Sequence, residues 1–222
     1  MIQNVKVEDA LIQLTNKGPG LHSMIIYDDL ITLREFYSYY IQRQIEEKKE
    51  MVLINPFYET TDSVRETLAT GYKAIDVEKY EKKEKRLVIG DSLKKYLGHK
   101  EKVVEIKDIK VKELESELEL EQEALTKTNK KTNKVKGYSN WWSDNEQMIK
   151  NANKMGNTGL SILADAGAFH FIGKTMDLLE YEYSLPKQFD LDLNMKAFCM
   201  YHQKDFDRLS KEQKQKLSNH HG

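Results

Sequence analysis

The chain has a single cysteine, only three prolines and no long hydrophobic run. The lone cysteine, Cys199, excludes a disulfide framework and a thiolate metal cluster within one chain, so a reducing cytoplasm is the expected compartment. No segment reaches the roughly 18 apolar residues that a membrane-spanning helix needs. The first residues also lack the apolar run of a signal peptide. These absences predict a cytoplasmic protein with no membrane contact.

An excess of charge of either sign is also missing, because 35 basic and 36 acidic residues leave a net charge of −1. This balance argues against nucleic-acid binding driven by bulk electrostatics, so nucleic acid is not an expected partner. A chain of 222 residues that is 39% hydrophobic, 32% charged and contains 12 tyrosines is typical of a globular protein. We expect a single domain over residues 1–222.

The last third of the chain gives the clearest indication of the fold. Residues 158–167 and 195–203 are apolar and predict two buried strands, and residues 169–185 between them predict a helix. A strand, a helix and a strand in this order form a right-handed βαβ unit, so the two strands should be parallel.

The same alternation of strands and helices continues through the rest of the chain. Strands are predicted at 21–27, 51–56, 74–77 and 86–89, and helices at 1–17, 30 to about 47, 63–70, 91–97 and 137–155. Continuous apolar runs are typical of strands buried on both sides. The sequence therefore predicts an α/β fold with a mostly parallel sheet and helices on both faces.

Residues 99–136 interrupt this pattern as a charged insertion. The segment 113–123 has an acid at every second position, and 127–136 is basic and polar. We interpret the insertion as a solvated excursion with a weakly packed helix. The alternative is a protruding arm, residues 114–136, that binds a partner, a second copy of the chain or nucleic acid.

A tripeptide that ends phosphate-binding loops, Gly173-Lys174-Thr175, lies within the predicted βαβ unit. Five residues rather than four separate it from Gly167, and they are bulky and apolar, which would block the backbone approach that such a loop needs. Residues 55–62, where an ATPase of this architecture would carry the loop, contain neither glycine nor lysine. A divergent ATP-binding protein stays open as an alternative.

Three aspartates, Asp28, Asp91 and Asp165, follow predicted strands. The carboxyl ends of parallel strands form the ligand crevice of such sheets, so these acids could bind a cation there. Aspartates in this position are also common helix caps: Asp28 or Asp29 can cap the helix expected from residue 30, and we favour capping over cation binding for Asp28 and Asp91. Asp165, followed by Ala-Gly-Ala, is the best candidate for a crevice residue.

Other reactive side chains carry weaker signals. Cys199 lies in a predicted buried strand, which favours an inert thiol. The six histidines show no ligand spacing, so no metal site is predicted. Trp141 and Trp142 are adjacent on a predicted helix and point about 100° apart, so one is expected inside and the other at a groove or rim.

Several short motifs, in their order along the chain, resemble a known family. They are His22 with Ile26-Tyr27-Asp28, then residues 64–71, then residues 162–165, 179–182, 198–201 and 217–220. In these motifs the chain resembles the MEDS domain, the methanogen and methylotroph sensory domain, over most of residues 18–221. Residues 46–49 depart from it, since they read Glu-Glu-Lys-Lys where the family tends to carry glycines.

The resemblance implies a degenerate relative of RecA- and KaiC-type ATPases that lacks the phosphate loop and senses small molecules such as hydrocarbon derivatives. Such domains are often joined to kinase or DNA-binding output domains. The chain leaves no room for one, so its signal is expected to pass to a separate protein, a kinase or a transcription regulator. No cofactor is expected, and the oligomeric state stays open.

Strand-end position and the resemblance together select the expected ligand-binding residues, and no catalytic residue is among them. The pocket is expected at the carboxyl ends of the strands, with the two tryptophans as an apolar wall. The expected residues are His22, Asp28, Asn55, Trp141, Trp142, Asp165, Glu182 and Tyr201.

Overall fold

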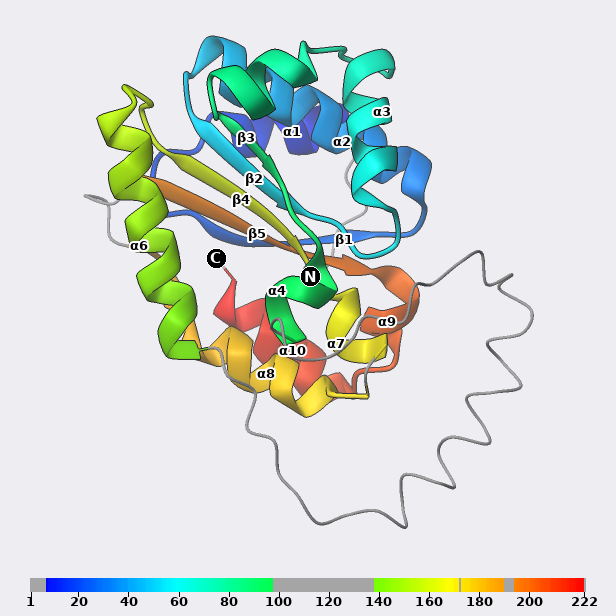
Figure 1. The fold of residues 1–222 in the computed structure, drawn as a ribbon. Coiled ribbons are helices and arrows are strands. Elements are labelled where there is room, and N and C mark those ends of the chain that lie inside the picture. Colours follow the sequence, from blue (N-terminus) through cyan, green and yellow to red (C-terminus); the bar gives the residue numbers. More distant parts are fainter. Residues whose placement is uncertain (1–6, 98–137, 172, 190–193, 222) are drawn as a thin grey trace.

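A computed structural model describes residues 7–97, 138–171, 173–189 and 194–221, with the side chains of 138–145 outside the description. Its centre is a five-stranded, all-parallel sheet in the order β1-β5-β4-β2-β3 (Figure 1). The strands are β1 (His22–Tyr27), β2 (Met51–Asn55), β3 (Leu87–Ile89), β4 (Leu160–Asp165) and β5 (Met195–His202). The predicted α/β fold with a parallel sheet is confirmed.

The predicted βαβ unit is present, since β4 and β5 are parallel neighbours with Leu160 opposite Met195. Its connecting helix is not continuous as predicted but consists of α7 (Gly167–Phe171) and α8 (Thr175–Ser184). Gly173 lies between them with φ of +67°, a left-handed conformation that interrupts a helix. The apolar periodicity continues across this break, which is why the pattern predicted one helix.

The strand predicted at residues 74–77 is wrong. Ile75 is buried, as the pattern implied, but its N–H donates to Leu68 O at 2.9 Å, back to the preceding helix rather than to a strand. Asp76 then accepts from Lys79 N–H at 2.9 Å and begins the next helical segment, which continues as η2 (Lys79–Lys83).

One face of the sheet is covered by α1 (Val7–Thr15), α2 (Leu30–Gln42), the π-helical turn η1 (Arg43–Glu47) and α3 (Thr61–Thr70), as Figure 1 shows above the strands. Side-chain caps fix where two of these helices begin. Asp29 accepts from Thr32 N–H at 2.8 Å, and Thr60 accepts from Ser63 N–H at 3.1 Å. Buried Phe36, Tyr40 and Leu68 pack from this side.

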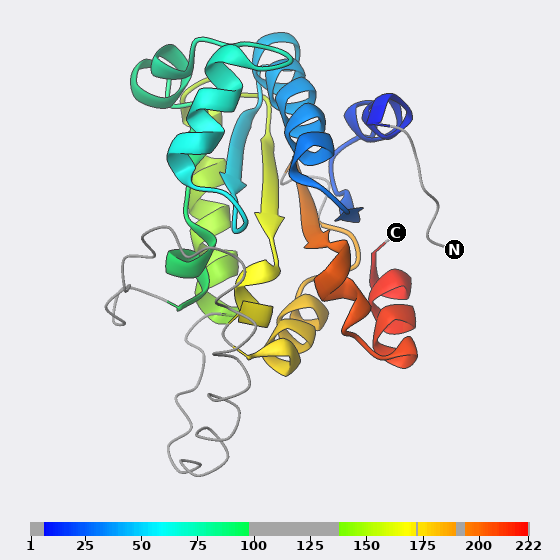
Figure 2. The same ribbon diagram turned by 90° about the vertical axis from the view of Figure 1, so that its right-hand side faces the viewer.

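The opposite face carries α4 (Ser92–Leu97), α6 (Tyr138–Lys154), α8, α9 (Gln203–Asp207) and α10 (Lys211–His220) (Figures 1 and 2). Successive strand residues point to opposite faces. In β2, Met51 and Leu53 belong to the core under α6 and α8, whereas Val52 and Ile54 belong to the core under α2. The sheet is thus buried on both sides, which accounts for the continuous apolar runs.

Within the described residues, no helix has the length and apolar character needed to cross a membrane. The charged insertion predicted at 99–136 lies outside the described residues.

Candidate functional site

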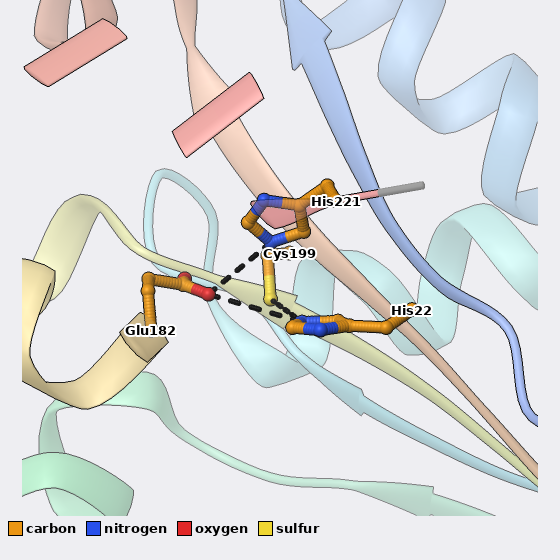
Figure 3. Close-up of side chains that lie close together, drawn as sticks. All are labelled: His22, Glu182, Cys199 and His221. Carbon is orange, nitrogen blue, oxygen red and sulfur yellow. Dashed lines mark hydrogen bonds and ion pairs between the residues drawn. The ribbon is translucent and has the colours of Figure 1, made fainter. Parts of the chain in front are cut away.

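Four buried side chains from separate parts of the chain meet beneath the sheet (Figure 3). His22 opens β1, Glu182 lies on α8, Cys199 is in β5, and His221 follows α10. One ligand-type atom from each lies within 4.8 Å of the others. We call these four residues the His/Cys/Glu centre.

The parallel register of β1 and β5 places two members of the centre together. His22 pairs with Ala197, so Cys199, two residues further along β5, points to the same face. His22 Nε2 and Cys199 Sγ are 3.4 Å apart. These two strands therefore supply the floor of the centre.

The two helices complete the centre from the opposite side. Glu182 lies one helical turn after buried Leu178 on α8, on the face turned toward the sheet. His221 similarly comes one turn after Leu217, the buried leucine of α10. His221 Nε2 is 3.2 Å and His22 Nε2 is 3.9 Å from Glu182 Oε2, and each of these side chains is at most 2% exposed.

Backbone carbonyls fix the orientation of both imidazole rings. His22 Nδ1 donates to Pro186 O, and His221 Nδ1 donates to Leu217 O, each at 2.9 Å. A carbonyl only accepts, so each Nδ1 carries a proton and each ring turns its Nε2 toward the centre. The other Glu182 oxygen, Oε1, accepts from Tyr201 Oη at 2.6 Å.

Burial and mutual charge set the protonation of the centre. Burial, together with the charge of His221, lowers the pKa of His22 to about 4, and burial raises the pKa of Cys199. Burial alone would raise the pKa of Glu182 and lower that of His221, but their attraction reverses both shifts. Without a bound ion the centre thus holds neutral His22, a thiol and an imidazolium–carboxylate pair.

Asp165 lies in a second polar cluster, at the carboxyl ends of the strands. Asp165 Oδ2 accepts from Tyr27 Oη at 2.6 Å, and Oδ1 accepts from Gly167 N–H at 2.8 Å. Ser92 Oγ donates to Asp165 O at 2.7 Å and is 3.4 Å from Asn55 O. Burial raises the pKa of Asp165 to about 7, although both hydrogen bonds to its carboxylate oppose the shift.

Aromatic side chains fill the space beside this second cluster. A side chain at Gly167 would collide with the ring of Phe57, and the ring of Tyr58 is nearly as close. Tyr58 Oη donates to Asp205, and the Tyr58 ring lies 5.0 Å from that of His202. The turn after β4 contains Gly167, the first glycine in the comparison with a phosphate-binding loop. This turn is therefore covered by aromatic side chains.

The structure divides the predicted site residues between several places. His22, Glu182 and Tyr201 come together at the His/Cys/Glu centre, although His22 is at the start of its strand and not at the predicted carboxyl end. Asn55 and Asp165 share the second cluster through Ser92. Trp141 and Trp142 belong to α6, but their side chains lie outside the described part of the chain.

The capping predictions for the strand-end acids have different outcomes. Asp91 accepts from Lys94 N–H at 3.0 Å, which confirms it as a cap. Of the two residues expected to cap α2, Asp29 is the cap, and the role favoured for Asp28 is wrong, because Asp28 is an exposed residue between β1 and that cap.

Sequence reasoning missed the roles of Cys199 and His221 in the centre. Metal-binding motifs are recognised by short spacings, and here each ligand-type residue comes from a different element. The one usable signal was a buried-strand cysteine together with acids and histidines on helices that pack on that strand.

Comparison with protein-family models and with curated proteins finds no match to the chain. The resemblance to the MEDS domain therefore stays a prediction.

Proposed function

We propose that the chain is a non-catalytic sensory module that binds a small molecule and passes its signal to a separate protein, a kinase or a transcription regulator. One observation carries the proposal: His221 completes the buried centre, and it directly follows α10. A ligand that changes the contacts of the centre would therefore also change the docking of α10.

The contacts of α10 with the rest of the protein are few enough for the helix to undock. His220 Nε2 donates to Leu185 O at 3.0 Å, and Leu217 and His221 are the buried residues of this segment. Most other described side chains of α10 are exposed or half-buried. A ligand with different affinity for the docked and undocked states shifts their populations, and this shift is the proposed signal.

The covered turn after β4 favours a sensor over an ATP-binding protein. A phosphate at this turn would need the backbone amide of Gly167, which already donates to Asp165 Oδ1 at 2.8 Å. It would also have to displace the ring of Phe57. Phosphoryl transfer depends on positioned phosphates, and this arrangement offers no open cradle there.

Hydrogen exchange of the α10 amides tests the proposal. The purified protein is measured alone, with a panel of small apolar and halogenated compounds, and with magnesium-ATP. We expect at least one compound of the panel to change the exchange of α10 and to raise the thermal midpoint. His221→Ala should abolish the change in α10, whereas Asn219→Ala, an exposed position on the same helix, should retain it.

Two results would contradict the proposal. One is a panel in which no compound alters α10 exchange. The other is a stabilisation by magnesium-ATP that Lys174→Ala removes, which would favour the ATP-binding alternative.

A further inference from the structure

We infer that His22, Glu182, Cys199 and His221 bind a divalent transition-metal ion, and that zinc fits them best. This inference goes beyond the proposed function, because the ion would be a structural part of the centre and not the small molecule that is sensed. The argument for a metal concerns these four side chains and their neighbours alone.

The first argument is the kind of atoms that face one another. With Nδ1 of both rings committed to Pro186 O and Leu217 O, the centre receives two Nε2 atoms, one sulfur and one carboxylate oxygen. All four are donors of electron pairs to a metal. Within the described residues, Glu182 Oε2 and His221 Nε2 make no hydrogen bond of good geometry, but they face each other at 3.2 Å as a buried ion pair when His221 is protonated. A metal ion in place of the His221 proton would bind both atoms.

The second argument is spacing. Zinc binds sulfur at about 2.3 Å and nitrogen or oxygen at about 2.0–2.2 Å, so tetrahedral ligand atoms lie roughly 3.3–3.6 Å apart. His22 Nε2 to Cys199 Sγ is 3.4 Å, His221 Nε2 to Glu182 Oε2 is 3.2 Å, and His22 Nε2 to Glu182 Oε2 is 3.9 Å. Three of the six distances among the ligand atoms are thus within a few tenths of an ångström of a tetrahedral set, and all six are at most 4.8 Å.

The third argument is the outer shell. Metal-bound histidines usually donate their second ring N–H to a carbonyl or carboxylate, and metal-bound carboxylates are themselves hydrogen-bonded. Both histidines here donate Nδ1–H to a carbonyl, and Tyr201 Oη donates to the outer oxygen of Glu182 at 2.6 Å. The support that a metal site needs is therefore present around all three oxygen and nitrogen ligands.

The donor set also selects among metals. A thiolate and two imidazoles disfavour magnesium and calcium, which prefer oxygen ligands. Four protein ligands fill a tetrahedral zinc shell and leave no open position, which is typical of structural rather than catalytic sites. The ion would thus join His221 to β1, β5 and α8, and hold α10 in its docked state.

Cobalt(II) is the probe that tests this site, since it substitutes for zinc and its visible spectrum reports tetrahedral thiolate coordination. The full chain, free of any polyhistidine tag and stripped by a chelator, is titrated with cobalt and then with zinc. We expect one cobalt per chain with intense visible bands, which zinc abolishes by displacement. Cys199→Ser should remove the sulfur-to-cobalt charge-transfer band.

His221→Ala should weaken zinc binding by about 100-fold or more, because loss of even an outer-shell partner typically costs 10–100-fold. The matched control, Asn219→Ala, should bind zinc as the wild type does. His221 follows the last helical residue, so its removal leaves every strand and helix complete, and circular dichroism checks that the variant is folded.

A wild-type spectrum of octahedral cobalt only, or equal zinc affinity in His221→Ala and Asn219→Ala, would mean an adventitious ion only and would overturn the inference. The two proposals fail separately. Tetrahedral cobalt without any compound-dependent change in α10 exchange supports the metal site and contradicts the small-molecule sensor. A compound-dependent change in α10 exchange without metal binding supports the small-molecule sensor and contradicts the metal site.

Discussion

At the scale of single residues, Asp165 shows how position and environment combine. Its place after a buried strand predicted a crevice residue, and the structure buries it against Tyr27. The environment could not be read from the sequence, because Tyr27, Asn55 and Ser92 come from other parts of the chain. Asp205 and Tyr58, from α9 and the segment after β2, add negative charge and a second phenol nearby.

The raised pKa of Asp165 predicts a pH-dependent stability. The folded state holds this proton up to about pH 7, whereas an exposed aspartate releases it at 3.8. Between these values the folded state binds more protons at Asp165, so the contribution of this residue to the free energy of unfolding falls as pH rises from about 4 to 7 and then levels. His22, whose pKa is lowered to about 4, contributes a slope of the opposite sign. Asp165→Asn should remove the contribution of the aspartate, which changes by up to about 4 kcal/mol between pH 4 and 7. Urea unfolding of the variant and the wild type at several pH values measures the difference.

Asp28→Asn is the matched control, because Asp28 also follows a strand but is exposed. Asp28→Asn should keep the wild-type dependence of the free energy of unfolding on pH. Parallel pH profiles for the wild type and Asp165→Asn would contradict the prediction.

At the scale of elements, Glu50, between the π-helical turn η1 and strand β2, forms a buried ion pair with Lys196 of strand β5. Lys196 Nζ donates to Glu50 Oε1 at 2.6 Å and to Gln44 Oε1 at 3.2 Å, with the lysine and glutamate side chains 4% and 8% exposed. Ser161 Oγ donates to the other carboxylate oxygen at 2.6 Å. The apolar run around Lys196 predicted the strand but gave no sign of the partner.

Removing one partner of this pair should be costly. Glu50→Ala leaves the Lys196 ammonium buried without its carboxylate, so we expect a loss of about 3 kcal/mol or more in urea unfolding. Glu212→Ala, which breaks the exposed pair with Lys216, should cost less than about 1 kcal/mol. Similar small losses in both variants would show that Lys196 finds water or another partner.

The break between α7 and α8 gives another prediction at this scale. Gly173 has φ of +67°, where a side chain is strained, so Gly173→Ala should destabilise the protein by about 1 kcal/mol. Gly18→Ala is the control, since Gly18 has no positive φ and its added Cβ would meet open space. Thermal unfolding compares the two. An equal midpoint for both variants would mean that the helix break does not require glycine.

At the scale of the whole molecule, local patterns predicted the layers but not how distant segments meet. All five strands and most helices follow from apolar runs, caps and periodicity. The failures were residues 74–77, where an apolar residue packs without forming a strand, the helix break at Gly173, and helices α9 and α10, which the sequence analysis did not predict. The His/Cys/Glu centre depends on His22 and His221, whose rings lie 4.4 Å apart although they come from opposite ends of the described chain. No spacing rule carries that information.

The central claim is that occupancy of this centre controls the docking of α10. The most direct measurement is hydrogen exchange of the α10 amides in chelator-stripped protein, with and without one equivalent of zinc, in the wild type and in His221→Ala. The account predicts that zinc slows exchange in α10 of the wild type and leaves His221→Ala unchanged. Wild-type exchange that stays the same at saturating zinc would contradict it.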